Sequence, residues 1–148
     1  MYKRQVLAEA YRRPQPPVGL ASAIAAHACA ALDVSDGLLA DLGHLARASG
    51  IGIELDLAAV PVSDAASRWV AGQTDRLAGL MRLATAGDDD QTVMAVRPDD
   101  WPALSAAAEA AGVRLSRIGA CAAGSGVRVL GPGDVQIEPA GAGGWTHF

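Results

Sequence analysis

The sequence has few aromatic residues, few cysteines and no long apolar run. Its aromatic residues are one Phe, three Trp and two Tyr among 148 residues, so a hydrophobic core must consist mainly of Ala, Val, Leu and Ile. Cys29 and Cys121 are far apart and lack metal-type spacing, which argues against a disulfide scaffold or a zinc site. The longest apolar run, 21–32, contains His27 and is shorter than the roughly 18 residues that a membrane helix needs.

The net charge and the N-terminal segment argue against further classes of protein. A net charge of -4 argues against a nucleic-acid partner, because phosphate backbones are bound mainly by Lys and Arg. The pair Arg12-Arg13 before Pro14 excludes a signal-peptide core near the start, so we expect a cytoplasmic protein with no membrane partner. Residues 1–5 match the pentapeptide that a transposon-end sequencing adaptor encodes, and we expect them to be a scar, although an ordinary basic helix start has the same composition. The remaining residues, 6–148, are expected to form one domain.

Apolar periodicity and turn residues predict helices that alternate with strands. The expected helices cover 21–31, 36–49, 64–70, 75–84 and 101–111, with Ser35 as N-cap of the second and Gly50 at its C-terminal end. Ser63 or Asp64 is expected to cap the third helix and Asp100 the last. The expected strands cover 31–34, 51–57, 91–96, 113–118, 127–130 and 135–138, and the last two flank a hairpin turn. This order predicts an α+β fold with a mixed β-sheet covered by helices.

Asp33-Val34-Ser35-Asp36-Gly37 lies where an expected strand meets a helix N-terminus. A helix N-terminus attracts anions, yet two carboxylates at the same place would repel a bare phosphate. The arrangement makes sense if Mg²⁺ lies between the carboxylates and a phosphate, since Mg²⁺ takes hard oxygen ligands. Plain capping, with Ser35 as cap and Asp36 in the first turn, is the more common meaning of this spacing taken alone.

Two further segments have residues that could bind a ligand. Gly87-Asp88-Asp89-Asp90 follows an expected helix, and it could hold a cation or an amine-bearing ligand or be a solvated acidic turn. Near the C-terminus, Trp145 could stack on a flat, cationic heterocycle, or it could pin the tail to the core. The Gly124-Ser125-Gly126 run lacks the strand–turn–helix context of a phosphate loop.

Taken in order, these motifs resemble the second half of thiamine-monophosphate kinases, in the aminoimidazole-ribonucleotide-synthetase superfamily. The resemblance covers nearly all of 6–148. The residues that carry it are Arg13-Pro14, Asp33-Val34-Ser35-Asp36-Gly37-Leu38, Ala48-Ser49-Gly50, Pro61, Ala86-Gly87-Asp88-Asp89, Ile118-Gly119 and Gly144-Trp145-Thr146-His147-Phe148. It implies a C-terminal, substrate-side domain whose N-terminal partner, which holds most nucleotide ligands and the dimer core, is absent from this chain.

The resemblance also implies roles for five residues. Asp33 and Asp36 would bind Mg²⁺, Ser35 would contact ATP, and Asp88 and Trp145 would contact thiamine monophosphate. The acidic turn departs from the family pattern, because Asp88 stands where the family has Glu and Asp90 where it has an aromatic residue.

The implied activity is ATP-dependent phosphorylation of thiamine monophosphate to thiamine diphosphate by direct in-line transfer. This chain alone is expected to be inactive, and a homodimer is expected only with the N-terminal domain. Two alternatives stay open. The chain could be a binding module that holds a phosphorylated ligand without catalysis, or part of another ATP-using member of the superfamily.

Overall fold

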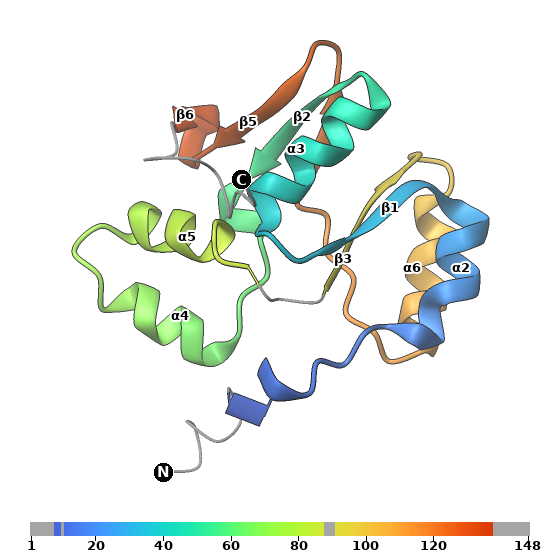
Figure 1. Cartoon of the computed structure of the whole chain (residues 1–148), viewed down its shortest axis with the longest axis horizontal. Helices are drawn as coiled ribbons and strands as arrows, with labels where there is room; N and C mark the ends of the chain where they lie inside the picture. The colour runs from blue at the N-terminus through green and yellow to red at the C-terminus, as the bar shows by residue number, and fades with distance from the viewer. Residues whose placement is uncertain (1–7, 10, 88–90, 138–148) are drawn as a thin grey trace.

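Helices and strands alternate along the chain, as the apolar periodicity predicts (Figure 1). The structure is a computed structural model of the whole chain, and it describes residues 8–9, 11–87 and 91–137. The helices are α2 (Ala21–His27), α3 (Leu38–Ser49), α4 (Asp64–Ala71), α5 (Arg76–Ala84) and α6 (Trp101–Ala110), with short 3-10 turns at Val18–Leu20, Leu57–Ala59 and Pro132–Asp134. The strands are β1 (Ala28–Val34), β2 (Gly52–Asp56), β3 (Gln91–Val96), β4 (Gly119–Ala122), β5 (Gly126–Leu130) and β6 (Gln136–Ile137).

The strands form two sheets in the described part of the chain. The larger sheet has the order β4-β2-β5-β6 and is mixed, because β2 pairs parallel to β5 and antiparallel to β4. The hairpin of β5 and β6 closes one edge, as predicted. β1 and β3 form a separate antiparallel pair. The predicted α+β class with a mixed sheet is therefore confirmed.

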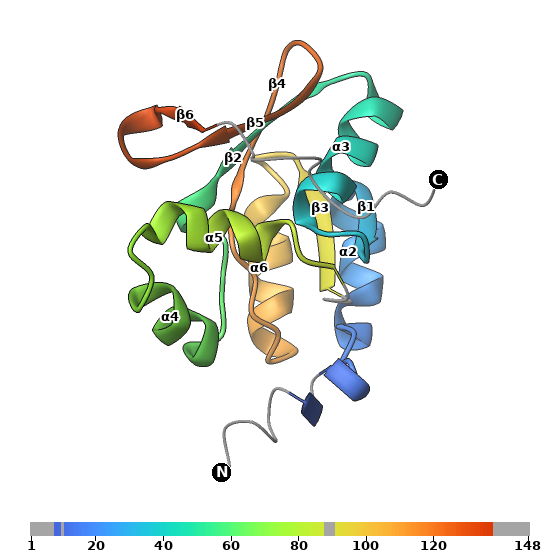
Figure 2. The ribbon, with the colours of Figure 1, turned by 60° about the vertical axis from the view of Figure 1, so that its left-hand side comes forward.

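Helix α3 packs between the two sheets and supplies much of the main hydrophobic core (Figure 2). Its buried stripe includes Leu38, Leu42 and Leu45, at the helical spacing that the sequence indicates. These side chains meet Leu55 of β2 and Val129 of β5. Because α3 is held on both sides, the residues at its N-terminus are fixed relative to both sheets.

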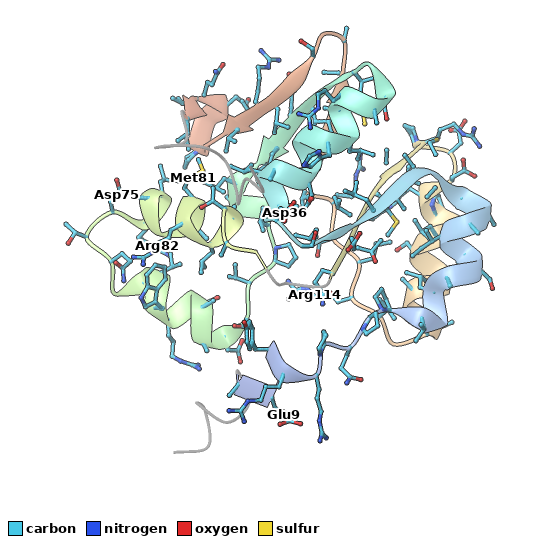
Figure 3. The ribbon with its side chains drawn as sticks, in the orientation of Figure 1. Glu9, Asp36, Asp75, Met81, Arg82 and Arg114 are labelled. Carbon is cyan, nitrogen blue, oxygen red and sulfur yellow. The ribbon has the colours of Figure 1, made fainter. Side chains whose placement is uncertain are left out.

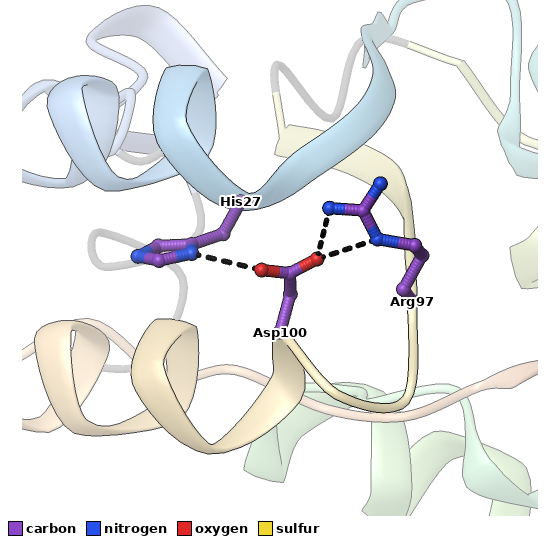
Figure 4. Close-up of polar contacts among 3 residues, drawn as sticks. All are labelled: His27, Arg97 and Asp100. Carbon is purple, nitrogen blue, oxygen red and sulfur yellow. Dashed lines mark hydrogen bonds and ion pairs between the residues drawn. The ribbon is translucent and has the colours of Figure 1, made fainter.

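A smaller core lies between α2 and α6, beside the β1–β3 pair (Figure 1). A polar cluster ties the same elements together (Figure 4). Arg97 donates from Nε to Asp100 Oδ2 over 2.8 Å, and His27 Nδ1 lies 3.3 Å from Asp100 Oδ1. The hydrogen bonds from His27 and Arg97 hold the pKa of Asp100 below its ordinary value.

Three of the expected elements are wrong in detail. Helix α2 ends at His27, not residue 31, because residues 28–34 pair with β3 and this pairing overrides the helix propensity of alanine. Residues 113–118 are not a strand, and β4 begins at Gly119, where pairing with β2 starts at Leu55. Asp100 occupies the N-cap position of α6 without a capping bond, since its carboxylate contacts His27 and Arg97 instead.

The cap of α4 is one of the two residues expected from the sequence, and α5 has its cap at the residue where the helix was expected to begin. Ser63 accepts from the N–H of Ala66, and Asp75 accepts from the N–H of Ala78. No helix in the described residues is long and apolar enough to cross a membrane.

Candidate functional site

The loop Ser35-Asp36-Gly37 joins the end of β1 to the start of α3 (Figure 3). Gly37 is the N-cap residue of α3 and has φ 111°. A Cβ atom at Gly37 would lie 2.8 Å from the carbonyl oxygen of Thr85 and 3.0 Å from that of Ala86. Both the backbone angle and the space therefore require glycine here.

Asp41, in the first turn of α3, fixes the backbone of this loop by hydrogen bonds. Its Oδ2 atom accepts from the N–H of Ser35 over 2.9 Å and from the N–H of Asp36 over 3.1 Å. Asp41 is only 3% exposed, and it is the buried charged residue of the described core. Asp41 is not among the residues expected at the site, although an acidic residue inside the apolar stripe of 38, 39, 42 and 45 is a signal that it has a polar partner.

The structure brings the loop together with the segment that precedes the acidic turn. A Cβ atom at Gly87 would lie 2.4 Å from the carbonyl oxygen of Ser35, so the two backbones touch. Gln91 pairs with Val34 across the β1–β3 ladder. Asp88 lies outside the described residues, but Gly87 and Gln91, the described residues that flank 88–90, both lie against the segment 34–37.

The predicted ligand residues of this loop differ in exposure. Asp33 and Ser35 are exposed, and Asp36 is half-buried. The expectation that Ser35 caps α3 is wrong, because the helix begins two residues later and Asp41 takes up the loop amides. The Ser35 side chain is therefore not used as a helix cap. Trp145 lies outside the described residues.

Asp36 and Asp41 also lie close to His44, for which the sequence predicts no role. Oxygens of Asp36 and Asp41 and a ring nitrogen of His44 lie within 4.8 Å of one another. His44 is exposed and also lies 2.7 Å from the guanidinium of Arg47. Carboxylate oxygens suit Mg²⁺, whereas an imidazole is not one of its usual ligands. Asp36 therefore fits a Mg²⁺ ligand better than His44 does.

A hollow of the described surface lies elsewhere. It has a volume of about 260 Å³ and is lined by residues such as Gly52, Ser125 and Arg128. Gly52 follows the C-terminal end of α3, whereas the Ser35–Gly37 loop precedes its N-terminal end. Helix α3 therefore separates this hollow from the Ser35–Gly37 loop.

A family model described as the C-terminal domain of AIR synthase related proteins matches residues 4–131. The chain belongs to this family. A thiamine-monophosphate kinase of Caulobacter vibrioides is 44% identical over 137 residues, which cover 93% of this chain and 38% of that protein. A thiamine-monophosphate kinase of Escherichia coli K12 is 36% identical over 114 residues, covering 76% of this chain and 34% of that protein.

Solved structures agree with this family. A thiamine-monophosphate kinase from Stenotrophomonas maltophilia has a TM-score of 0.68 and 41% identity, over 79% of this chain and 36% of that one. AaThiL, solved in complex with AMPPCP and TMP, has a TM-score of 0.73 and 27% identity, over 97% of this chain and 41% of that one. The predicted resemblance is confirmed, and the chain spans well under half the length of these relatives.

Proposed function

We propose that this chain is the substrate-side part of a kinase that transfers a phosphoryl group from ATP to thiamine monophosphate, giving thiamine diphosphate. The observation that carries the proposal is the backbone contact between the Ser35–Gly37 loop and Gly87. This contact joins two of the motifs by which the sequence resembles the kinases. The complex of AaThiL with AMPPCP and TMP supports ATP and thiamine monophosphate as the two substrates.

In this proposal the chain positions the reactants and forms no covalent bond with them. In-line phosphoryl transfer needs aligned oxygens and a counter-charge for the phosphates, which a magnesium ion supplies when bound. Asp33 and Asp36 would hold that ion, and exposed Ser35 would donate to the nucleotide. Asp88 and Trp145 would contact thiamine monophosphate.

The domain organisation in the proposal follows from the matched length. The chain would act together with an N-terminal part that carries most nucleotide ligands and the dimer interface, as a homodimer. The scar at 1–5, the cytoplasmic location and the absence of nucleic-acid and membrane partners stay predictions from the sequence. The departure at Asp88 favours, as the second candidate, a module that binds a phosphorylated ligand without catalysis.

The test uses a chimera in which this chain replaces the matching 137 residues of the Caulobacter vibrioides relative. In the chimera, Trp145→Ala should weaken thiamine monophosphate binding by about two- to thirty-fold, since the cation–π and area contributions of such a ring amount to roughly 0.5–2 kcal/mol. ATP binding should stay nearly unchanged. Trp145→Phe should lose much less affinity, because a ring face remains.

Calorimetry with each ligand on both variants separates the proposal from a structural role of Trp145. An equal loss for ATP and thiamine monophosphate, together with a lower melting temperature, would place Trp145 in the core. That result would remove it from the substrate site.

A further inference from the structure

We propose that Asp41 is a positioning residue that makes the Ser35–Gly37 loop select a divalent cation over a phosphate. The inference deepens the proposed function and rests on it for the identity of the site. It assigns a role to a residue outside the set of ligands that the sequence resemblance implies.

The N–H groups of Ser35 and Asp36 are two consecutive backbone donors at the start of α3. Consecutive N–H groups that lead into a helix N-terminus commonly bind phosphate. Here the N–H groups of Ser35 and Asp36 both donate to Asp41 Oδ2, over 2.9 and 3.1 Å. The Asp41 carboxylate thus occupies the two N–H donors that a phosphate would use.

Asp41 brings a negative charge close to Asp36. Asp41 is only 3% exposed, so water and salt screen its charge weakly. One of its oxygens and one of Asp36 belong to a group of ligand atoms within 4.8 Å of one another. Two carboxylates at this separation repel each other, and a bound cation relieves the repulsion. Asp41 therefore favours a cation at Asp36 without having to coordinate it.

The backbone on which Asp36 lies is fixed from two sides. The hydrogen bonds from Ser35 and Asp36 fix the backbone from which the Asp36 side chain projects. The carbonyl oxygen of Ser35 is held on its other side by Gly87, where any Cβ would clash. The loop is clamped between Asp41 and the 85–87 segment, so the Asp36 carboxylate is placed before any ligand arrives.

The experiment measures Mn²⁺ as a probe for Mg²⁺, and inorganic phosphate as the anion, on the full chain without nucleotide or thiamine monophosphate. Asp41→Asn keeps the size and an acceptor oxygen but removes the charge. We expect its Kd for Mn²⁺ to rise by about tenfold, as expected for loss of one charge near a partly solvated divalent ion. Asp75→Asn is the matched control, because it removes the same charge from the cap of α5, away from the loop (Figure 3), and should change the Kd less than about twofold.

Two further readouts separate positioning from a merely structural role. In the unaltered chain, Mn²⁺ should broaden the amide NMR signals of Ser35 and Asp36 more strongly than that of Ala78, which donates to Asp75. In Asp41→Ala, where the two amides are released, inorganic phosphate should shift the signals of Ser35 and Asp36. Phosphate should not shift them in the unaltered chain.

The proposal is overturned if Mn²⁺ leaves the loop signals of the unaltered chain sharp, or if folded Asp41→Asn binds Mn²⁺ as tightly as the unaltered chain. Phosphate binding by the unaltered loop would also overturn it. These outcomes are distinct from failure of the kinase proposal. That failure would appear as absent thiamine monophosphate binding in the chimera, with the Mn²⁺ effect of Asp41→Asn intact.

Discussion

At the scale of single residues, two glycines and one buried carboxylate fix the backbone of the candidate site. Gly37 and Gly87 allow the loop and the 85–87 segment to touch backbone to backbone. Asp41 then fixes the loop by accepting from two of its N–H groups. The sequence indicated both glycine motifs, but their contact depends on long-range packing, which spacing along the chain does not encode.

Replacing Gly37 with Ala should lower the free energy of unfolding by about 2 kcal/mol or more, because a left-handed backbone angle and a contact of 2.8 Å with the Thr85 oxygen are both unfavourable for a Cβ. Gly43→Ala is the control within the same helix. Nothing lies within 4 Å of a Cβ at Gly43, so this change should raise the free energy by about 0.5–1 kcal/mol. Urea unfolding of both variants measures the difference. Equal stability of the two would contradict the backbone clamp.

At the scale of helices and strands, local signals predicted some elements and failed for others. The cap at Ser63 and the apolar stripe of α3 depend on neighbours close along the chain, so the sequence shows them directly. The boundary between α2 and β1 depends on pairing with β3, more than 60 positions away, and alanine-rich sequence gave no sign of it. Ser35 resembles a helix cap in the sequence. In the fold, Asp41 in the first turn of α3 accepts from the N–H of Ser35, and the helix begins after Gly37.

The cluster of His27, Arg97 and Asp100 leads to a prediction about pH. The pKa of Asp100 is held below its ordinary value of 3.8, chiefly by the hydrogen bonds from His27 and Arg97. The folded state thus favours the ionised carboxylate, and this stability is present above the ordinary value and is lost as pH falls through the lowered one. Asp100→Asn should therefore lower stability at neutral pH and weaken its decline in acid.

Thermal unfolding from neutral pH down through the carboxyl range measures this effect. Asp99→Asn is the matched control, since it removes an adjacent, exposed carboxylate that raises the pKa of Arg97 less than Asp100 does. If Asp100→Asn and Asp99→Asn decline in parallel with the unaltered chain, the cluster does not link α2 to α6.

At the scale of the whole molecule, the chain matches only part of the length of its relatives, and in our proposal it holds one side of a larger site. It matches 38% of the length of the Caulobacter vibrioides relative and 41% of the AaThiL chain. The side chains of Asp33 and Ser35 are exposed and that of Asp36 is half-buried. We therefore expect the chain to need the N-terminal part for turnover, and the purified chain to form no thiamine diphosphate by itself.

The most direct measurement is the rate at which the chimera converts ATP and thiamine monophosphate to ADP and thiamine diphosphate. The account predicts equal amounts of both products, and loss of most of the rate in Asp36→Asn but not in Asp75→Asn. A chimera that melts cooperatively and binds ATP, yet forms no thiamine diphosphate, would contradict the proposed function. Turnover by the isolated chain, purified free of host kinase, would contradict the proposed need for the N-terminal part.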